Sequence, residues 1–259
     1  MEDILDIQHE ESSDPLDGPS LQYLRENGYN FSFGKYWETG WNAMKDDVGW
    51  YVLYGFLAGI ISILVSFTYI GQYLIGGALF AGFFVYGAKV IRKEKREFGN
   101  FFDGFKDVGQ LFIFSLLQTL ASIVVFVPVI LILGFNFDLF TNPERLSGYD
   151  PQDLLMQILP MYAVVFIGLI LIYTFMQFCI PLIVLGRLSA VQSIKWSYII
   201  ISKNFFWFLL FCFVVGVISI AGVFACYVGL LFTIPFGQCL FFGAYKEIVG
   251  LGDKRVTGY

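Results

Sequence analysis

Charged residues are scarce in this sequence: Asp, Glu, Lys and Arg together make up 14% of its 259 residues. Soluble globular domains carry about 25% charged residues. Hydrophobic residues reach 57%, so a soluble fold would lack the polar side chains needed to cover its surface. The composition excludes an ordinary soluble domain and predicts an integral membrane protein.

Histidine occurs once, as His9. A single histidine excludes metal centres with several histidine ligands, and it leaves no credible Ser/His/Asp arrangement. The four cysteines lie in apolar stretches without metal-ligand spacing, and no phosphate-binding glycine motif occurs. We therefore predict that the chain is not an enzyme, has no cofactor or metal, and binds no nucleic acid.

Charge is absent altogether from four long stretches, which are residues 49–88, 108–137, 154–186 and 204–245. A helix that crosses the hydrocarbon core of a bilayer needs about 20 residues. The first and last stretches, of 40 and 42 residues, are long enough for two crossings each, and each middle stretch suits one. The sequence thus predicts an all-α bundle of six transmembrane helices, over about 49–69, 71–90, 108–134, 157–185, 204–225 and 228–247.

The distribution of lysine and arginine predicts the orientation of this bundle. With six spans, 15 of the 16 basic residues fall on the side that carries both chain ends. The 138–153 loop on the other side has four acidic residues against Arg145 alone. Because basic residues are retained on the cytoplasmic side, we expect both termini there, in a multi-pass protein of the cytoplasmic (inner) membrane.

The ends of the chain differ from its middle. Residues 1–30 hold eight acidic residues and one arginine, unlike a secretory signal peptide, and predict a disordered cytoplasmic tail. This tail is a candidate docking segment for a basic protein partner. Residues 31–250 form the predicted membrane domain, and residues 251–259 form a short cytoplasmic C-terminal tail.

The two predicted hairpins resemble each other. Ser32-Phe33 and Trp50 lie 157 positions before Ser189-Ala190 and Trp207. Both hairpins begin on the same predicted side, so their relation is parallel and predicts a pseudo-two-fold axis along the membrane normal. The residues before the spans, such as 188–203 and 98–106, mix apolar and polar side chains at helical spacing. They predict short amphipathic helices in the headgroup layer.

Two sets of polar residues are candidate contact sites. The basic residues Arg92, Lys93, Lys95 and Arg96 are candidates for binding anionic lipid headgroups, although they also serve simply as topology determinants. Within the spans, Gln118, Gln177 and Gln238 are candidates for polar contacts between helices. Their amides are more typical of structural hydrogen bonds than of a substrate site.

A family likeness follows from the motifs that flank the spans. They are Trp41 and Trp50, the segment Phe101-Phe102-Asp103-Gly104-Phe105-Lys106, the segment Ser189-Ala190-Val191-Gln192-Ser193-Ile194, Pro235, and Gly243-Ala244-Tyr245. Over about residues 30–250 the chain resembles an uncharacterised prokaryotic family of six-helix integral membrane proteins. That family is similar to the membrane domain of glycerophosphodiester phosphodiesterases. The resemblance implies an inner-membrane location and a role around lipids, but no catalytic residue.

The absence of charge inside the spans limits the function classes, because ion paths and proton relays normally place ionisable residues there. We expect a non-enzymatic inner-membrane protein that acts as a scaffold, an accessory or a lipid-associated module, with membrane lipids as partners. The alternative is a permease for an apolar or zwitterionic lipid-like solute. A third hypothesis is surface chemistry by the loop carboxylates Asp103 and Asp107.

Overall fold

The computed structural model describes residues 21–135, 151–225 and 228–251, and no strand is found in these ranges. The predicted all-α class is confirmed for this part of the chain. In chain order, the helices are α1 (Leu21–Asn27), α2 (Phe33–Met44), α3 (Val48–Ser66), α4 (Tyr69–Ile91), η1 (Phe98–Asp107), α5 (Val108–Phe135), α8 (Pro151–Phe175), α9 (Cys179–Val184), α10 (Ala190–Lys203), α11 (Phe205–Ala221), η2 (Gly222–Ala225) and α12 (Leu230–Val249), with η1 and η2 being 3-10 helices.

Five helical segments are long and apolar enough to cross a membrane. Within the described ranges they are Val48–Ser66, Gly71–Ile91, Phe98–Val127, Tyr162–Val184 and Phe205–Ala225. The chain thus has the build of a multi-pass membrane protein. The predicted sixth span corresponds to α12, which has 20 residues but also carries Gln238, Lys246 and Glu247. It is less apolar than the other five, and its crossing stays a prediction.

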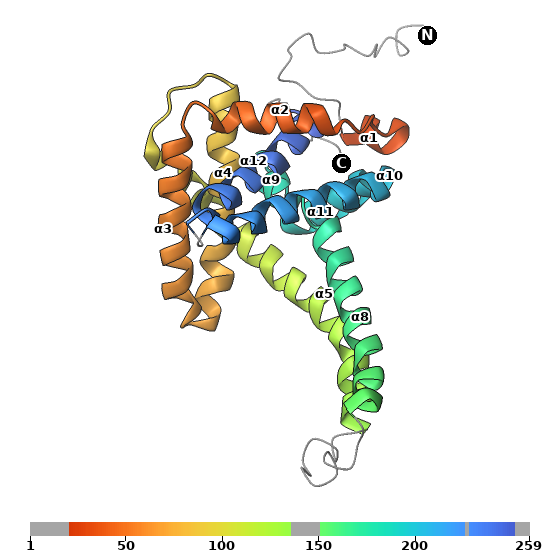
Figure 1. The fold of residues 1–259 in the computed structure, drawn as a ribbon. Helices are drawn as coiled ribbons and strands as arrows, with labels where there is room; N and C mark the ends of the chain where they lie inside the picture. Colours follow the sequence, from red (N-terminus) through yellow and green to blue (C-terminus); the bar gives the residue numbers. More distant parts are fainter. Residues whose placement is uncertain (1–20, 136–150, 226–227, 252–259) are drawn as a thin grey trace, which may run out of the picture.

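Figure 1 shows how these helices are arranged. α1 and α2 lie across one end of the molecule, α3 runs away from that end, and α4 returns to it. α5 and α8 form a second pair that diverges from α3 and α4 with distance from α2. We call the end that holds α2 and the C-terminal ends of α4 and α12 the basic end, because the Lys89–Arg96 segment follows α4 there.

The contacts between helices follow a pattern of three units rather than two. Each unit is a short helix followed by two longer ones: α2 with α3 and α4, η1 with α5 and α8, and α10 with α11 and α12. Each short helix packs on the last part of another unit: η1 on α4, α10 on α8 and α9, and α2 on α12. The third contact closes a ring. The two hairpins predicted to be related in parallel correspond in sequence to the first and third units, and their parallel relation stays a prediction; the second unit was not part of it.

Glycines allow the short helices to approach their partners closely. A Cβ atom at Gly40 of α2 would lie 2.7 Å from the carbonyl oxygen of Cys239 in α12. In the same way, a Cβ atom at Gly104 of η1 would lie 2.7 Å from the carbonyl oxygen of Ala78 in α4. Because no side chain separates the two backbones, these crossings are as close as the small-residue contacts typical of membrane helices.

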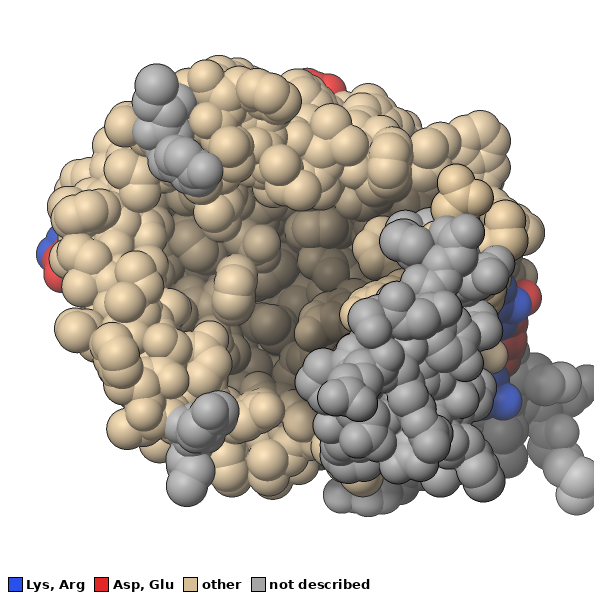
Figure 2. All heavy atoms as spheres, turned by 60° about the horizontal axis from the view of Figure 1, so that its bottom comes forward, with Lys and Arg blue, Asp and Glu red and all other residues tan. Residues whose placement is uncertain are grey.

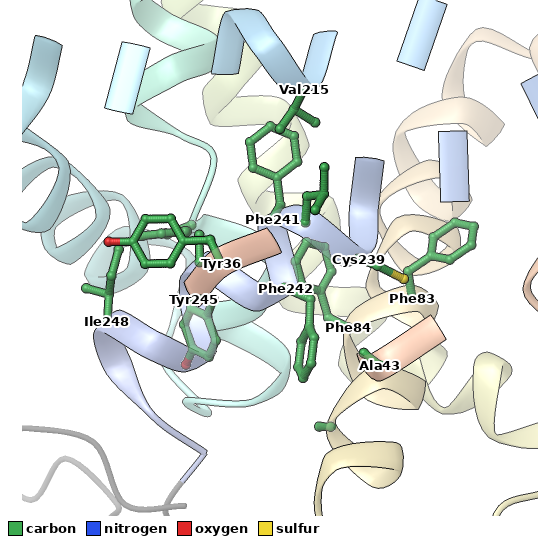
Figure 3. Packing of buried hydrophobic residues seen from close by; sticks show 14 of the residues in the cluster. Tyr36, Ala43, Phe83, Phe84, Val215, Cys239, Phe241, Phe242, Tyr245 and Ile248 are labelled. Carbon is green, nitrogen blue, oxygen red and sulfur yellow. The ribbon is translucent and has the colours of Figure 1, made fainter. Parts of the chain in front are cut away.

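The core lies near the basic end, where α2, α4 and α12 meet. Figure 3 shows Phe241, Phe242 and Tyr245 of α12 among residues of α2 and α4, including Tyr36 and Phe84. All five of these side chains are buried. By contrast, α3, α5, α8 and α11 expose many large apolar side chains, as expected for helices that face lipid.

The predicted fourth span is not one continuous helix. α8 ends at Phe175 and α9 begins at Cys179, within the span expected over 157–185. Pro181 explains the break, because a proline has no N–H and its ring clashes with the carbonyl group four residues earlier. Ser197 of α10 forms hydrogen bonds with the backbone at this break. Its hydroxyl donates to the Phe175 carbonyl oxygen at 2.6 Å and accepts from the Phe178 N–H at 3.3 Å.

Two further expectations need correction. The helix expected over 188–203 exists as α10, but its buried side includes Ser193 and Ser197, while Val191 and Tyr198 are exposed. The side that faces the protein thus combines small residues with Ile200 and Ile201, which are fully buried. The predicted disordered tail is also too long, because α1 buries Leu21 and Leu24 and contacts α10. Residues 1–20, 252–259 and most of the 138–153 loop lie outside the described residues.

Candidate functional site

The face opposite the basic end is hollowed at its centre (Figure 2). The walls of the hollow that are visible in this view show no Lys, Arg, Asp or Glu, and the charged side chains in sight lie at the outline of the molecule. A pocket of about 460 Å³ lies among α4, α5 and the α8–α9 segment, which we call the polar pocket. Its lining consists of Gln72, Tyr73, Gly76, Gly77, Phe80, Phe114, Ser115, Gln118, Thr119, Ser122, Tyr173 and Ile180.

One face of α5 supplies most of the polar groups. Ser115, Gln118, Thr119 and Ser122 follow the i, i+3, i+4, i+7 spacing, so they lie on one side of the helix. Three of them are hydroxyl residues, and each donates a hydrogen bond of 2.9 Å to the carbonyl oxygen four residues earlier in α5. Their hydroxyl protons are therefore occupied, and their oxygen atoms remain able to accept hydrogen bonds from a ligand.

α4 supplies the opposite wall through residues that also share a helix face. Gln72, Gly76 and Phe80 are four positions apart. Gly76 makes room for the amide of Gln72, since a Cβ atom there would lie 3.0 Å from Gln72 Nε2. Next to it, Gly77 lets α4 approach α5, because its Cβ atom would lie 3.2 Å from that of Leu111. Beyond this contact, the polar face of α5 borders the pocket.

The lining contains two glutamine amides. No hydrogen bond of the Gln72 or Gln118 side chain is found within residues 21–135, 151–225 and 228–251. An amide offers two N–H donors and a carbonyl acceptor. Gln72 is exposed and Gln118 is partly buried, so both amides are accessible to a molecule in the pocket. No residue of the lining carries a formal charge. The pocket therefore suits a molecule that forms hydrogen bonds but has no net charge.

An aromatic stack closes the protein toward the basic end. The ring of Phe101 in η1 lies between Tyr54 and Tyr86, with centroid distances of 4.4 and 4.0 Å and nearly parallel planes. All three side chains are buried. The Tyr54 hydroxyl donates to the Leu79 carbonyl oxygen at 2.8 Å, which ties α3 to α4. The hollow is open on the face of Figure 2, and the packed rings join α3, α4 and η1.

The four predicted headgroup-binding cations do not form one free patch. Arg96 pairs with Asp47 at 2.8 Å, and Lys95 pairs with the exposed Glu97, also at 2.8 Å. Arg92 lies 3.8 Å from Glu94 and donates to the Leu251 carbonyl oxygen. For Lys93, no ion pair is found among the described residues, and its side chain is exposed. The protein itself thus engages three of the four cations.

The three predicted intramembrane glutamines do not meet. Gln118 lines the polar pocket, whereas Gln177 lies between α8 and α9 and Gln238 lies within α12. In the described part of the chain their side chains form no hydrogen bond, so the expected contacts between helices are not made there. Our sequence reasoning singled out Gln118 but missed the hydroxyl residues beside it. Their helical spacing over 115–122 was the available signal.

One of the two carboxylates of the enzymatic hypothesis is held in ion pairs at the basic end. Asp103 lies 2.7 Å from Lys106 and 3.4 Å from Lys89. Among residues 21–135, 151–225 and 228–251, no group of three His, Cys, Asp or Glu side chains is arranged to hold a metal ion.

Comparisons with known proteins give no relative for this chain. No family model matches the sequence, and no curated protein or solved structure is significantly similar to it.

Proposed function

We propose that this chain is a non-enzymatic, lipid-associated membrane protein that holds an uncharged or zwitterionic lipid-like molecule in the polar pocket. The observation that supports this proposal is an uncharged lining with two amides that have no hydrogen-bond partner among the described residues, on helices long and apolar enough for the membrane. A pocket of about 460 Å³ is within the range of roughly 300–1,000 Å³ that is usual for ligand sites.

The physical reason is the pairing of the polar groups of the lining with those of the ligand. A lipid tail offers Gln118 no hydrogen bond, whereas the hydroxyl, ester or amide groups of a lipid head do. No Lys, Arg, Asp or Glu lines the pocket, so the lining offers no opposite charge to an ionised head group. The site therefore selects for polarity without net charge.

The proposal also includes the membrane in which the protein lies and its orientation there. We place six crossings in the inner membrane, with the basic end in the cytoplasm, because the lysines and arginines gather there. The hollow then opens away from the cytoplasm. The likeness to the six-helix family that is similar to the membrane domain of glycerophosphodiester phosphodiesterases is kept as part of this proposal, and it too implies a role around lipids.

A permease for the same class of molecule is the second candidate, and the open hollow favours it. Transport would require a path through the basic end, where Phe101 is held between Tyr54 and Tyr86. A permease must therefore separate η1 from α3 and α4 in each cycle. A simple lipid-binding module needs no such motion, and for that reason we rank it first.

Lipid analysis of the purified protein tests the proposal. We would extract the protein in mild detergent and quantify the lipids that remain bound to the unaltered chain and to Ser122→Phe. Ser122 lies in the lining, so a phenyl ring there fills the pocket. The matched control is Leu120→Phe, on the outward side of the same helix, where the side chain is 59% exposed.

We expect a neutral or zwitterionic lipid at about one molecule per chain in the unaltered protein and in Leu120→Phe, and its loss in Ser122→Phe. Equal lipid content in all three proteins would contradict the proposal. A co-purifying protein in place of a bound lipid would instead favour the scaffold or accessory role.

A further inference from the structure

A second pocket lies on the other side of α4. It has a volume of about 240 Å³ and is bounded by α3, α4 and the start of α12; we call it the apolar pocket. Ser62 is the polar side chain of its lining. The remaining lining residues are Gly55, Ala58, Gly59, Leu79, Phe80, Phe83, Leu230, Leu231, Ile234 and Pro235.

Two glycines of α3 determine the shape of this pocket. A Cβ atom at Gly55 would lie 2.8 Å from Pro235 Cγ, so α3 and α12 touch there and close the pocket toward the basic end. One turn further along α3, a Cβ atom at Gly59 would meet nothing within 4 Å. The pocket is therefore a narrow space between α3 and α12 that is open beyond the Gly55–Pro235 contact.

The two pockets meet at Phe80. This side chain lines both of them, and 42% of its surface is exposed. The polar pocket is lined by amide and hydroxyl side chains, and the apolar pocket by apolar side chains of α3, α4 and α12. Phe80 is the residue that the two linings share, so the two pockets adjoin at this position.

We propose that the polar and apolar pockets form one bipartite site for a single-chain amphiphile with an uncharged, hydrogen-bonding head. The head occupies the polar pocket, and the acyl chain passes Phe80 into the apolar pocket. This inference rests on the proposed function and names its ligand class. It goes further in specifying one chain and in assigning α3 and α12 to the site.

The dimensions support a single chain. The apolar pocket, at about 240 Å³, is below the range of roughly 300–1,000 Å³ for complete ligands, so it suits part of a molecule. It borders the polar pocket at Phe80 alone, which leaves one route for a chain. Since neither lining carries a formal charge, the head must be neutral as well.

Photochemical labelling by a monoacylglycerol tests this assignment. The protein, in lipid nanodiscs, would be exposed to two probes, one with a diazirine at the end of its acyl chain and one with a diazirine beside its glycerol head. Labelled peptides would then be mapped by mass spectrometry. We expect the head probe to label residues 114–122 of α5 and the chain-end probe to label residues 58–62 of α3 and 230–235 of α12.

Two substitutions separate the halves of the site. Gly59→Phe places a ring in the open part of the apolar pocket, and it should reduce chain-end labelling of 230–235 at least tenfold while head labelling of α5 persists. Gln118→Leu removes an amide from the polar pocket and should reduce labelling by both probes. The matched controls are Gly216→Phe, where a Cβ atom also meets nothing within 4 Å, and Gln238→Leu, which lies outside both pockets. Neither control should change the labelling.

The failure of this inference is distinguishable from the failure of the proposed function. If both probes label α4, α5 and α8, and Gly59→Phe has no effect, the bipartite site is wrong although the polar pocket binds the lipid. If labelling is confined to the lipid-facing surface and Gln118→Leu leaves it unchanged, the pocket binds no such molecule. Both proposals are then wrong.

Discussion

At several glycines the backbone of one helix approaches another so closely that a side chain has no room. They include Gly40, Gly82, Gly104 and Gly243. At Gly243 of α12, a Cβ atom would lie 2.7 Å from the backbone nitrogen of Gly40 and would overlap the carbonyl oxygen of Tyr36. Both obstacles are backbone atoms, so they cannot move aside as a flexible side chain can. The contact between α2 and α12, which closes the ring of units, depends on this crossing.

We predict that Gly243→Ala destabilises the protein. Overpacking of this kind costs about 1–3 kcal/mol. The melting temperature in detergent, followed by size-exclusion chromatography after heating, should fall by several degrees. Gly216→Ala on α11 is the matched control, because its Cβ atom meets nothing within 4 Å. Alanine is favoured over glycine in a helix by about 0.5–1 kcal/mol, so this control should be unchanged or slightly more stable. Equal melting temperatures of the two variants would contradict the close crossing.

Two ion pairs of the same length in the 92–97 segment differ in burial. Arg96–Asp47 and Lys95–Glu97 both measure 2.8 Å. The side chains of Arg96 and Asp47 are 34% and 20% exposed, and Asp47 also accepts a hydrogen bond of 2.8 Å from the Tyr86 hydroxyl. The side chains of Lys95 and Glu97 are 88% and 63% exposed, so water screens their attraction.

Replacing each cation by glutamine should therefore give different results. Arg96→Gln leaves Asp47 half-buried without its positive partner and should lower the free energy of unfolding by about 1–2 kcal/mol. Lys95→Gln should change it by less than about 0.5 kcal/mol. Denaturant titration of both variants in the same detergent measures the difference. If Lys95→Gln proved as destabilising as Arg96→Gln, burial would not be the deciding factor.

At the scale of the helices, charge alone located most elements. The span expected over 108–134 is α5 (Val108–Phe135), and the one expected over 71–90 is α4 (Tyr69–Ile91). This agreement has a simple cause. A charged residue is costly within the hydrocarbon core, so the borders of the charge-free stretches coincide with the ends of helices.

Neither the way the break between α8 and α9 is stabilised nor the polar pocket could be predicted from the sequence. Pro181 indicates a kink, but the hydroxyl that repairs the exposed backbone comes from Ser197, on a different helix. The pocket likewise depends on the rotation of α4 relative to α5, which places Gln72 and Gln118 in one lining. Periodicity shows which side chains share a helix face, but it does not tell which face of a neighbouring helix they meet.

We predict that α12 crosses the membrane. Val228 lies just before α12 and Lys246 lies in its last turn, so the two positions mark opposite ends of the helix. If α12 spans the membrane, Val228→Cys in sealed vesicles should react with an impermeant maleimide from one side and Lys246→Cys only from the other. The labelling of the native cysteines gives the baseline. Reaction of both positions from the same side would reduce the number of crossings to five.

For the whole molecule, the ring of three units explains why a hollow exists. The short helices α2, η1 and α10 hold the units together near the basic end, and the packed core lies there as well. Farther from that end, α5 and α8 diverge from α3 and α4 (Figure 1). Helices joined at one end and diverging at the other leave a central space on the face that Figure 2 shows. The polar face of α5 lines the polar pocket between this helix and α4. The proposed function requires that this space is open and takes up an uncharged amphiphile.

Thiol labelling of Ser122→Cys tests whether the space is open and takes up an uncharged amphiphile. In sealed vesicles we predict that an impermeant maleimide reaches this position from the side opposite the Arg92–Arg96 segment. Added monoacylglycerol should slow the reaction severalfold, whereas the fatty acid of equal chain length, being anionic, should not. If the thiol is unreactive from that side, or if both lipids affect the rate equally, the hollow is not the selective lipid site that we propose.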